Sequence, residues 1–205
     1  MSSILHLRKR LISLPTALEM PGVAIRPFNG TDPTIADADA RAWLGLREAS
    51  FAGMTAGGRP WSLDDFHREF AAKPWWKPER MLMAVGVVDG HKELLGSATL
   101  GRTGRPPDDE AALMWLMVLP AQRRRGLGHA LLGAIERLAL EAGETTLMLE
   151  THASWNEAVR LYRKAGYEQA TDQPVASNSS TTGLVPSPSQ SAAQRFRSRR
   201  GRGIG

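Results

Sequence analysis

The stretch from residue 111 to residue 151 constrains the fold more than any other part of this sequence. Residues Ala111 to Val118 form a continuous apolar run that ends at Pro120, which predicts a buried strand. Residues 128–142 then repeat leucine and isoleucine at helical spacing with charged residues between them, and residues 145–151 predict another strand. A strand, a glycine-bearing turn, a helix and a second strand in this order predict an α/β fold.

The turn between that first strand and the helix combines three consecutive arginines, Arg123 to Arg125, with Gly126 and Gly128. Glycines let the backbone turn tightly and leave amide groups unpaired at the start of the helix, where the helix dipole favours an anion. The segment therefore predicts a binding site for a diphosphate. A dinucleotide fingerprint fails because Leu131 replaces its third small residue, and a P-loop fails because Gly-Lys-Ser/Thr is absent. A solvated basic loop without a ligand is the remaining alternative.

Turn and capping residues indicate the other elements. The Asp-Gly dipeptide at 89–90 is a strong hairpin signal and predicts that residues 81–88 and 94–100 pair as strands. Ser62, followed three residues later by Asp65, resembles a capping box and predicts the start of a helix. The sequence also predicts a strand at 23–28 and helices at 35–51 and 157–165.

The length of 205 residues, 42% of them hydrophobic, suits one domain with a tail. We expect residues 1–20 to form an N-terminal extension, residues 21–170 the folded domain, and residues 171–205 a disordered Ser/Pro/Arg-rich tail. The extension contains a basic triplet and is either a targeting segment or a loosely helical addition. The tail has too few large apolar residues to offset an ordering cost of roughly 1–2 kcal/mol per residue.

The net charge of +5 comes from the two ends of the chain. Residues 173–205 carry five arginines and no acid, and residues 1–20 carry three basic residues and one acid, which leaves the folded part near neutral. The basic run at 195–203 interleaves arginine with glycine and one phenylalanine, so weak nucleic-acid binding through the tail is an alternative function.

Several other function classes are excluded or disfavoured. The chain has no cysteine, so it has no disulfide, thiol nucleophile or thiolate metal site, and we expect a cytoplasmic protein. The five histidines show no ligand spacing, so no metal is expected. No apolar stretch approaches the roughly 20 residues needed to span a bilayer, and no membrane association is expected.

Two motifs together resemble the GNAT superfamily of N-acetyltransferases. The first is Arg123-x-x-Gly126-x-Gly128, which follows Leu-Met-Val-Leu-Pro and precedes Ala-Leu-Leu. The second runs from Asn156 to Tyr167 and contains Asn, Ala, Leu-Tyr, then Gly and an aromatic residue. The resemblance spans about residues 20–170. It implies a mixed, mostly antiparallel sheet flanked by helices, with acetyl-CoA as cosubstrate and a primary amine, on a small molecule or a protein, as acceptor.

The resemblance also implies roles for individual residues. In the family, backbone amides of the glycine turn hold the coenzyme A pyrophosphate, and the edge of the preceding strand pairs with the pantetheine arm. Tyr162 occupies the position of the general acid, although its helical spacing alone would also suit a core aromatic. A backbone N–H near Met117 or Val118 would stabilise the oxyanion. The residues assigned to acetyl-CoA are Leu116, Met117, Val118, Arg123, Arg124, Arg125, Gly126, Leu127, Gly128 and Asn156.

The general base is not evident. Ala112 stands where several family members carry a glutamate, and Glu110, two residues earlier, would point to the same face of the strand. We take Glu110 as the candidate, with Glu150 and His152 as further options. Trp75 and Trp76 precede the hairpin, in a region from which the family builds its acceptor pocket.

The last strand of the family's sheet is missing, because no apolar strand follows residue 170. The tail near residues 183–185, a second subunit in a homodimer, or an altered chain end that costs stability would each account for this. A domain that binds acyl-CoA without turning it over is therefore a further alternative function.

Overall fold

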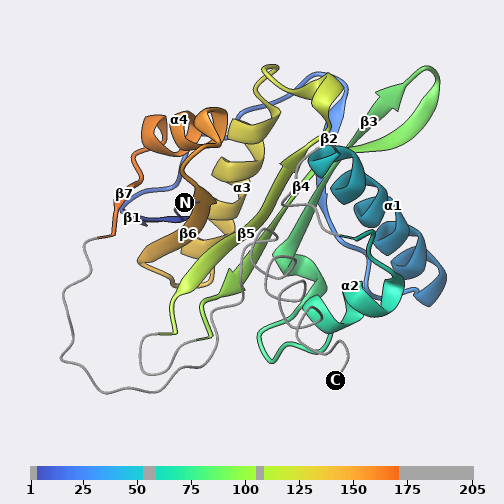
Figure 1. The fold of residues 1–205 in the computed structure, drawn as a ribbon, viewed down its shortest axis with the longest axis horizontal. Helices are drawn as coiled ribbons and strands as arrows, with labels where there is room; N and C mark the ends of the chain where they lie inside the picture. The colour runs from blue at the N-terminus through green and yellow to red at the C-terminus, as the bar shows by residue number, and fades with distance from the viewer. Residues whose placement is uncertain (1–3, 53–58, 105–108, 171–205) are drawn as a thin grey trace, which may run out of the picture.

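The computed structural model describes residues 4–52, 59–104 and 109–170. Seven strands form one sheet in the order β2-β3-β4-β5-β6-β1-β7, with α1 and α2 on one face and α3 and α4 on the other (Figure 1). All strand pairs are antiparallel except β5 with β6. The predicted mixed α/β fold is confirmed.

The strands are β1 (Ile4–Arg10), β2 (Val23–Pro27), β3 (Met81–Val88), β4 (His91–Arg102), β5 (Ala111–Val118), β6 (Thr146–His152) and β7 (Glu168–Gln169). The helices are α1 (Pro33–Phe51), α2 (Leu63–Glu69), α3 (Leu127–Glu141) and α4 (Asn156–Lys164), with short 3-10 turns at Pro78–Arg80 and Pro120–Gln122. Within the described residues, no helix combines the length and hydropathy needed to cross a bilayer.

Local sequence signals account for most of these bounds. Asp89 and Gly90 both adopt positive φ, 49° and 82°, and join β3 directly to β4 as the hairpin signal predicts. Ser62 and Asp65 form the predicted capping box at the start of α2, each side chain bonded to the backbone of the other.

Strand β1 corrects the expectation that residues 1–20 lie outside the domain. Ile4 to Arg10 pair antiparallel with β6 along the whole length of both strands, and β7 covers the other edge of β1. Leu7 is fully buried, and Lys9 forms an ion pair of 2.7 Å with Glu136 of α3. The basic residues of this segment therefore belong to a half-buried strand in the interior of the sheet.

The place of the missing last strand is thus filled from the N-terminus of the same chain. Each side of β1 is hydrogen-bonded, because Ala170 also donates its amide to the carbonyl of His6 at 2.9 Å. The sequence left the tail, a second subunit or an altered chain end open as explanations; with β1 in place, neither the tail nor a second subunit is needed at this position. The expected disordered tail at 171–205 lies outside the described residues.

Two apolar cores lie on opposite faces of the sheet. The first core packs α3 and α4 on the sheet through residues such as Leu131, Ile135 and Leu149. The second core lies under α1 and α2 and is built from aromatic rings, with Trp43 and Phe70 fully buried at its centre. Strand β5 contributes side chains to both cores, and this double contribution shapes the site described next.

Candidate functional site

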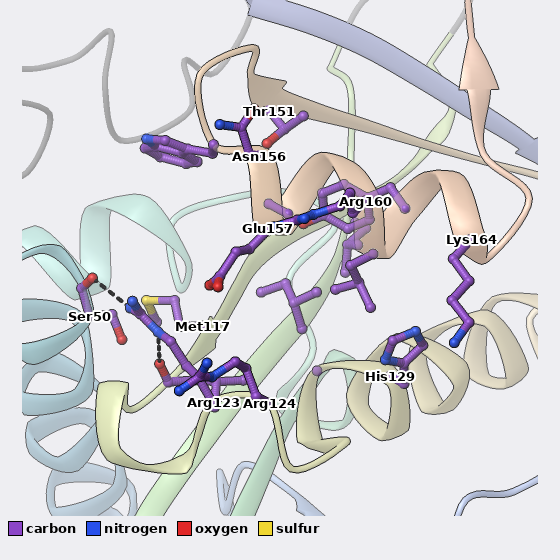
Figure 2. Close-up of a pocket in the computed structure, with 18 of the residues that line it drawn as sticks. Ser50, Met117, Arg123, Arg124, His129, Thr151, Asn156, Glu157, Arg160 and Lys164 are labelled. Carbon is purple, nitrogen blue, oxygen red and sulfur yellow. Dashed lines mark hydrogen bonds between the residues drawn. The ribbon is translucent and has the colours of Figure 1, made fainter.

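A cleft opens where the parallel strands β5 and β6 diverge. The two strands pair only at Ala112 with Met148 and at Leu113 with Leu149, although β5 continues to Val118. Helices α3 and α4 and the end of α1 enclose the space beyond, which has a volume of about 750 Å3 (Figure 2). A cavity of this size suits a ligand as large as a cofactor.

An irregularity in β5 turns its side chains across the sheet at the mouth of this cleft. Trp115 has φ of 55°, a left-handed conformation that is uncommon for a bulky residue, and the register with β4 shifts at the same place. Leu113 packs in the first core, Met114 and Trp115 both pack in the second, and Leu116 returns to the first. The bulge places Leu116, Met117 and Val118 along the cleft wall.

The start of α3 presents unpaired backbone donors to the cleft. Gly126, the residue before the helix, has φ of 91°, and no side chain caps the helix there. Arg124 also adopts positive φ, 61°, so the chain curls tightly before the first turn. The first amide groups of a helix lack intrahelical acceptors, and such a curl gathers them into an anion-binding concavity. Arg124, Gly126 and Gly128 line the cleft.

The three arginines of the turn have different environments. Arg123 lines the cleft and donates to the carbonyls of Val118, at 3.2 Å, and Ser50, at 3.1 Å, which ties the turn to β5 and α1 (Figure 2). Arg125 contacts Gln122 at 2.5 Å and does not line the cleft. Leu127 is also absent from the lining because it is buried in the first core. Of the residues predicted to bind acetyl-CoA in this turn, Arg125 and Leu127 therefore lie outside the cleft lining and the others lie within it.

Helix α4 supplies the opposite wall. Asn156 is its first residue, and Tyr162 lies six residues further along, buried among side chains of the first core. Both residues line the cleft. Burial raises the pKa of the Tyr162 phenol above its ordinary value, so the hydroxyl stays protonated throughout the physiological range.

Glu110 lies away from the cleft. It precedes the first residue of β5, whereas the cleft opens only beyond Leu113, and its carboxylate contacts Arg8 at 2.6 Å. Thr146 approaches the other carboxylate oxygen at 3.5 Å. The structure therefore does not bring Glu110 together with Tyr162 or with the start of α3.

Glu150 is the carboxylate that the structure places in the cleft from the sheet. It lies on β6, one residue beyond the last pairing with β5, and its side chain is 15% exposed. His6 of β1 approaches it, with 3.3 Å between the imidazole Nδ1 and the carboxylate Oε1. Sequence reasoning considered Glu150 but missed His6, because β1 was not recognised as a strand.

The sequence left two alternatives for Trp75 and Trp76, in which one of them lines the acceptor pocket or both pack over the sheet. Trp75 and Trp76 pack against the second core and do not line the cleft. Phe51, Trp115 and Trp155 line it instead, with ring centroids 6.5 Å apart for the Phe51 and Trp115 pair and 5.8 Å apart for Phe51 and Trp155. Among the described residues, no group of three His, Asp or Glu side chains could hold a metal ion.

Comparison with known proteins places this architecture in a family. The sequence profile of the acetyltransferase (GNAT) family matches residues 38–167. The chain belongs to the GNAT family. This match covers the bulged strand, the glycine turn, the start of α3 and the whole of α4, which are the elements that build the cleft.

Curated relatives of this GNAT chain include mycothiol acetyltransferases. One from Kineococcus radiotolerans is 32% identical over 170 residues, which cover 76% of this chain and 46% of the relative. Another from Frankia casuarinae is 33% identical over 174 residues, covering 80% of this chain and 47% of the relative. The chain spans about half the length of these relatives.

Solved structures show the same fold. A GCN5-related N-acetyltransferase from Sphaerobacter thermophilus aligns with a TM-score of 0.64 at 24% identity, over 82% of this chain and 48% of that chain. The ribosomal-protein-S18-alanine N-acetyltransferase from Escherichia coli aligns with a TM-score of 0.51 at 25% identity, over 73% of this chain and 79% of that chain.

Proposed function

We propose that this chain transfers the acetyl group of acetyl-CoA to a primary amine. The observation that carries the proposal is the cleft between β5 and β6, which brings a protonated Tyr162, the carboxylate of Glu150 and the uncapped start of α3 into one cavity. Acetyl-CoA carries a pyrophosphate, for which the start of α3 is an anion site. Transfer of its acetyl group from the thioester to an amine is assisted by an acid and a base.

The residues present fit acetyl-CoA. Amide groups at Gly126 and Gly128, together with Arg124, would hold the pyrophosphate, because a helix start without a side-chain cap leaves donors for an anion. The edge of β5 from Leu116 to Val118 has no β6 partner and would pair with the pantetheine arm. Asn156 would contact the same arm from α4.

The chain's own residues would then move two protons. When bound, acetyl-CoA supplies an acetyl group activated as a thioester. Glu150 accepts a proton from the substrate ammonium so that a neutral amine attacks the carbonyl carbon. Tyr162 donates its phenolic proton to the departing sulfur and regains a proton from the attacking nitrogen, which must lose a second proton to become an amide. A backbone N–H near Met117 or Val118 stabilises the negative charge on the carbonyl oxygen.

The need for a base depends on the acceptor. Deprotonating a lysine-like amine of pKa about 10.4 at pH 7 costs about 4.6 kcal/mol, whereas an α-amine of pKa about 8 costs about 1.4 kcal/mol. The names of the relatives support a small-molecule acceptor of mycothiol metabolism. The rings of Phe51 and Trp155, which line the same cleft as Glu150, are suited to holding an ammonium-bearing molecule of that size.

Release of the coenzyme A thiol tests the proposal. Acetyl-CoA is mixed with glucosamine, alanine amide, cysteine amide or a lysine-containing peptide, and the free thiol produced is measured with correction for the acceptor's own thiol. We expect at least one amine to be acetylated, with the product identified by mass. Binding of acetyl-CoA without acetylation of any amine would favour the alternative of a domain that binds acyl-CoA without turnover.

Replacing Glu150 by glutamine is expected to lower kcat about 100-fold at pH 7, because general-base catalysis contributes roughly 10²–10⁴-fold. The loss is expected to shrink as the pH approaches the pKa of the acceptor amine, since less of the amine then needs deprotonation. Initial rates from pH 6.5 to pH 9.5 measure this. Glu110→Gln, which removes the carboxylate outside the cleft, serves as the comparison, and a slower Glu110→Gln with a normal Glu150→Gln would reverse the assignment.

A further inference from the structure

We propose that His6 of β1 is a positioning residue that holds the carboxylate of Glu150 toward the cleft and passes its proton to solvent. The inference rests on the proposed function. It assigns a task in the reaction to a strand that lies outside the part of the chain matched by the family profile.

The strand register places the two side chains together. His6 lies directly opposite Glu150 in the antiparallel pair of β1 and β6, so both side chains point to the same face of the sheet. The neighbouring Leu7 points to the other face and is buried in the first core, which fixes the orientation of β1. The contact of 3.3 Å between His6 and Glu150 is therefore set by backbone pairing on both sides of β1.

A proton route from the cleft to water requires that the outer residue be more exposed than the inner one, and the two side chains meet this requirement. Glu150 is 15% exposed and lines the cleft, whereas His6 is 41% exposed at the outer side of the same contact. A substrate that fills the cleft would reduce the access of water to Glu150 further. His6 then connects the carboxylate to bulk water without passing through the ligand.

The proton balance of the reaction gives this route a purpose. An ammonium and a thioester yield an amide, a thiol and one proton, as the C–N bond forms and the C–S bond breaks. Glu150 takes that proton from the ammonium and passes it to Nδ1 of His6. The resulting Nδ1–H donates to the carboxylate and holds it toward the cleft until water removes a proton from the imidazolium and returns the ring to the form that accepts the next one. Imidazole suits this step because its ordinary pKa, about 6.5, lies between those of a carboxyl group and an amine.

A set of histidine variants tests the inference in the full chain. His6→Ala is expected to lower kcat about tenfold while leaving the KM for acetyl-CoA unchanged. Added imidazole is expected to restore the rate, because the vacated position is open to solvent. His6→Asn keeps a side-chain donor near the carboxylate but cannot carry the proton, so we expect an intermediate rate. His91→Ala, at the exposed first residue of β4, is the matched control.

The double variant with Glu150→Gln separates a role through Glu150 from a general effect on structure. If His6 acts through Glu150, adding His6→Ala to Glu150→Gln produces little further loss, and imidazole no longer rescues the rate. Equal losses in both backgrounds, or an active wild-type protein whose His6→Ala variant keeps full activity, would overturn the inference alone. A wild-type protein that binds acetyl-CoA but acetylates no amine would overturn the proposed function and this inference with it.

Discussion

A chain that lacks residues 1–12 is expected to lose its cooperative fold. Removing β1 exposes both the edge of β6, along seven paired residues, and the part of the first core that Leu7 covers. It also leaves Glu136, whose side chain is 5% exposed, without the Lys9 ammonium. Breaking a buried ion pair by removing one partner costs about 3–5 kcal/mol, a large part of the stability of a typical domain. Circular dichroism during thermal denaturation measures the effect.

A milder change on the same strand makes the prediction quantitative. Leu7→Ala is expected to reduce the free energy of unfolding by about 2–5 kcal/mol, because it opens a cavity in a fully buried site. Arg10→Ala, on the exposed face of β1, is the matched control and is expected to change it by less than about 0.5 kcal/mol. Urea denaturation of the two variants measures both changes in the free energy of unfolding. A shortened chain that melts at the wild-type temperature would show that β1 does not complete the sheet.

Replacing Tyr162 by phenylalanine is expected to lower kcat about 100-fold without weakening acetyl-CoA binding. The phenol lies in the cleft wall and burial raises its pKa, so it stays protonated at neutral pH and has a proton to donate. General-acid catalysis by a positioned group contributes roughly 10²–10⁴-fold. Phenylalanine keeps the ring that packs against Tyr167, with centroids 6.0 Å apart, so the fold should be preserved. Steady-state kinetics and calorimetric titration separate the two effects.

The other tyrosine of the chain provides the control. Tyr167 is buried in the same core but does not line the cleft, so Tyr167→Phe should keep kcat within about twofold even if it lowers stability. If Tyr162→Phe retained full activity, Tyr162 would be a packing residue, which its helical spacing alone also suits.

Much of the fold was predictable because short-range chemistry determines it. The Asp-Gly turn at 89–90, the Ser62 capping box and the apolar run of β5 each act over a few residues and need no knowledge of the partner element. The glycine turn before α3 was also predictable, since positive φ at Gly126 follows from a tight strand-to-helix connection.

The part that escaped prediction depends on long-range pairing. In β1, Leu5 and Leu7 alternate with His6 and Arg8, but the next inward residue is Lys9, whose burial is stabilised by Glu136 on α3. A lysine at an inward position hides the period-two pattern of a strand, because its partner is distant in sequence.

The candidate base shows the same limit. Glu110 lies two residues before Ala112 and was therefore expected to point to the same face of the strand. The bulge at Trp115 and the divergence of β6 instead decide which carboxylate reaches the cleft. Neither the position of the bulge nor the extent of parallel pairing can be read from the residues of β5 alone. Glu150, on the neighbouring strand, is the better candidate because the two strands separate next to it and open the cleft there.

Titration of acetyl-CoA into the wild-type protein and into two variants at Gly128 tests the central claim most directly. A side chain at Gly128 fits without a clash, since a Cβ would lie 3.5 Å from Leu161 and 4.0 Å from Val118. Asp and Asn have the same shape, so their difference reports charge alone. A carboxylate about 4 Å from a phosphate is repelled by about 1–4 kcal/mol at the effective dielectric constants of water and of a protein surface.

We expect micromolar binding by the wild-type protein and at least about tenfold weaker binding by Gly128→Asp than by Gly128→Asn, since 1.4 kcal/mol corresponds to a factor of ten. Equal affinities of the two variants, or no binding of acetyl-CoA by a folded wild-type protein, would contradict a pyrophosphate site at the start of α3.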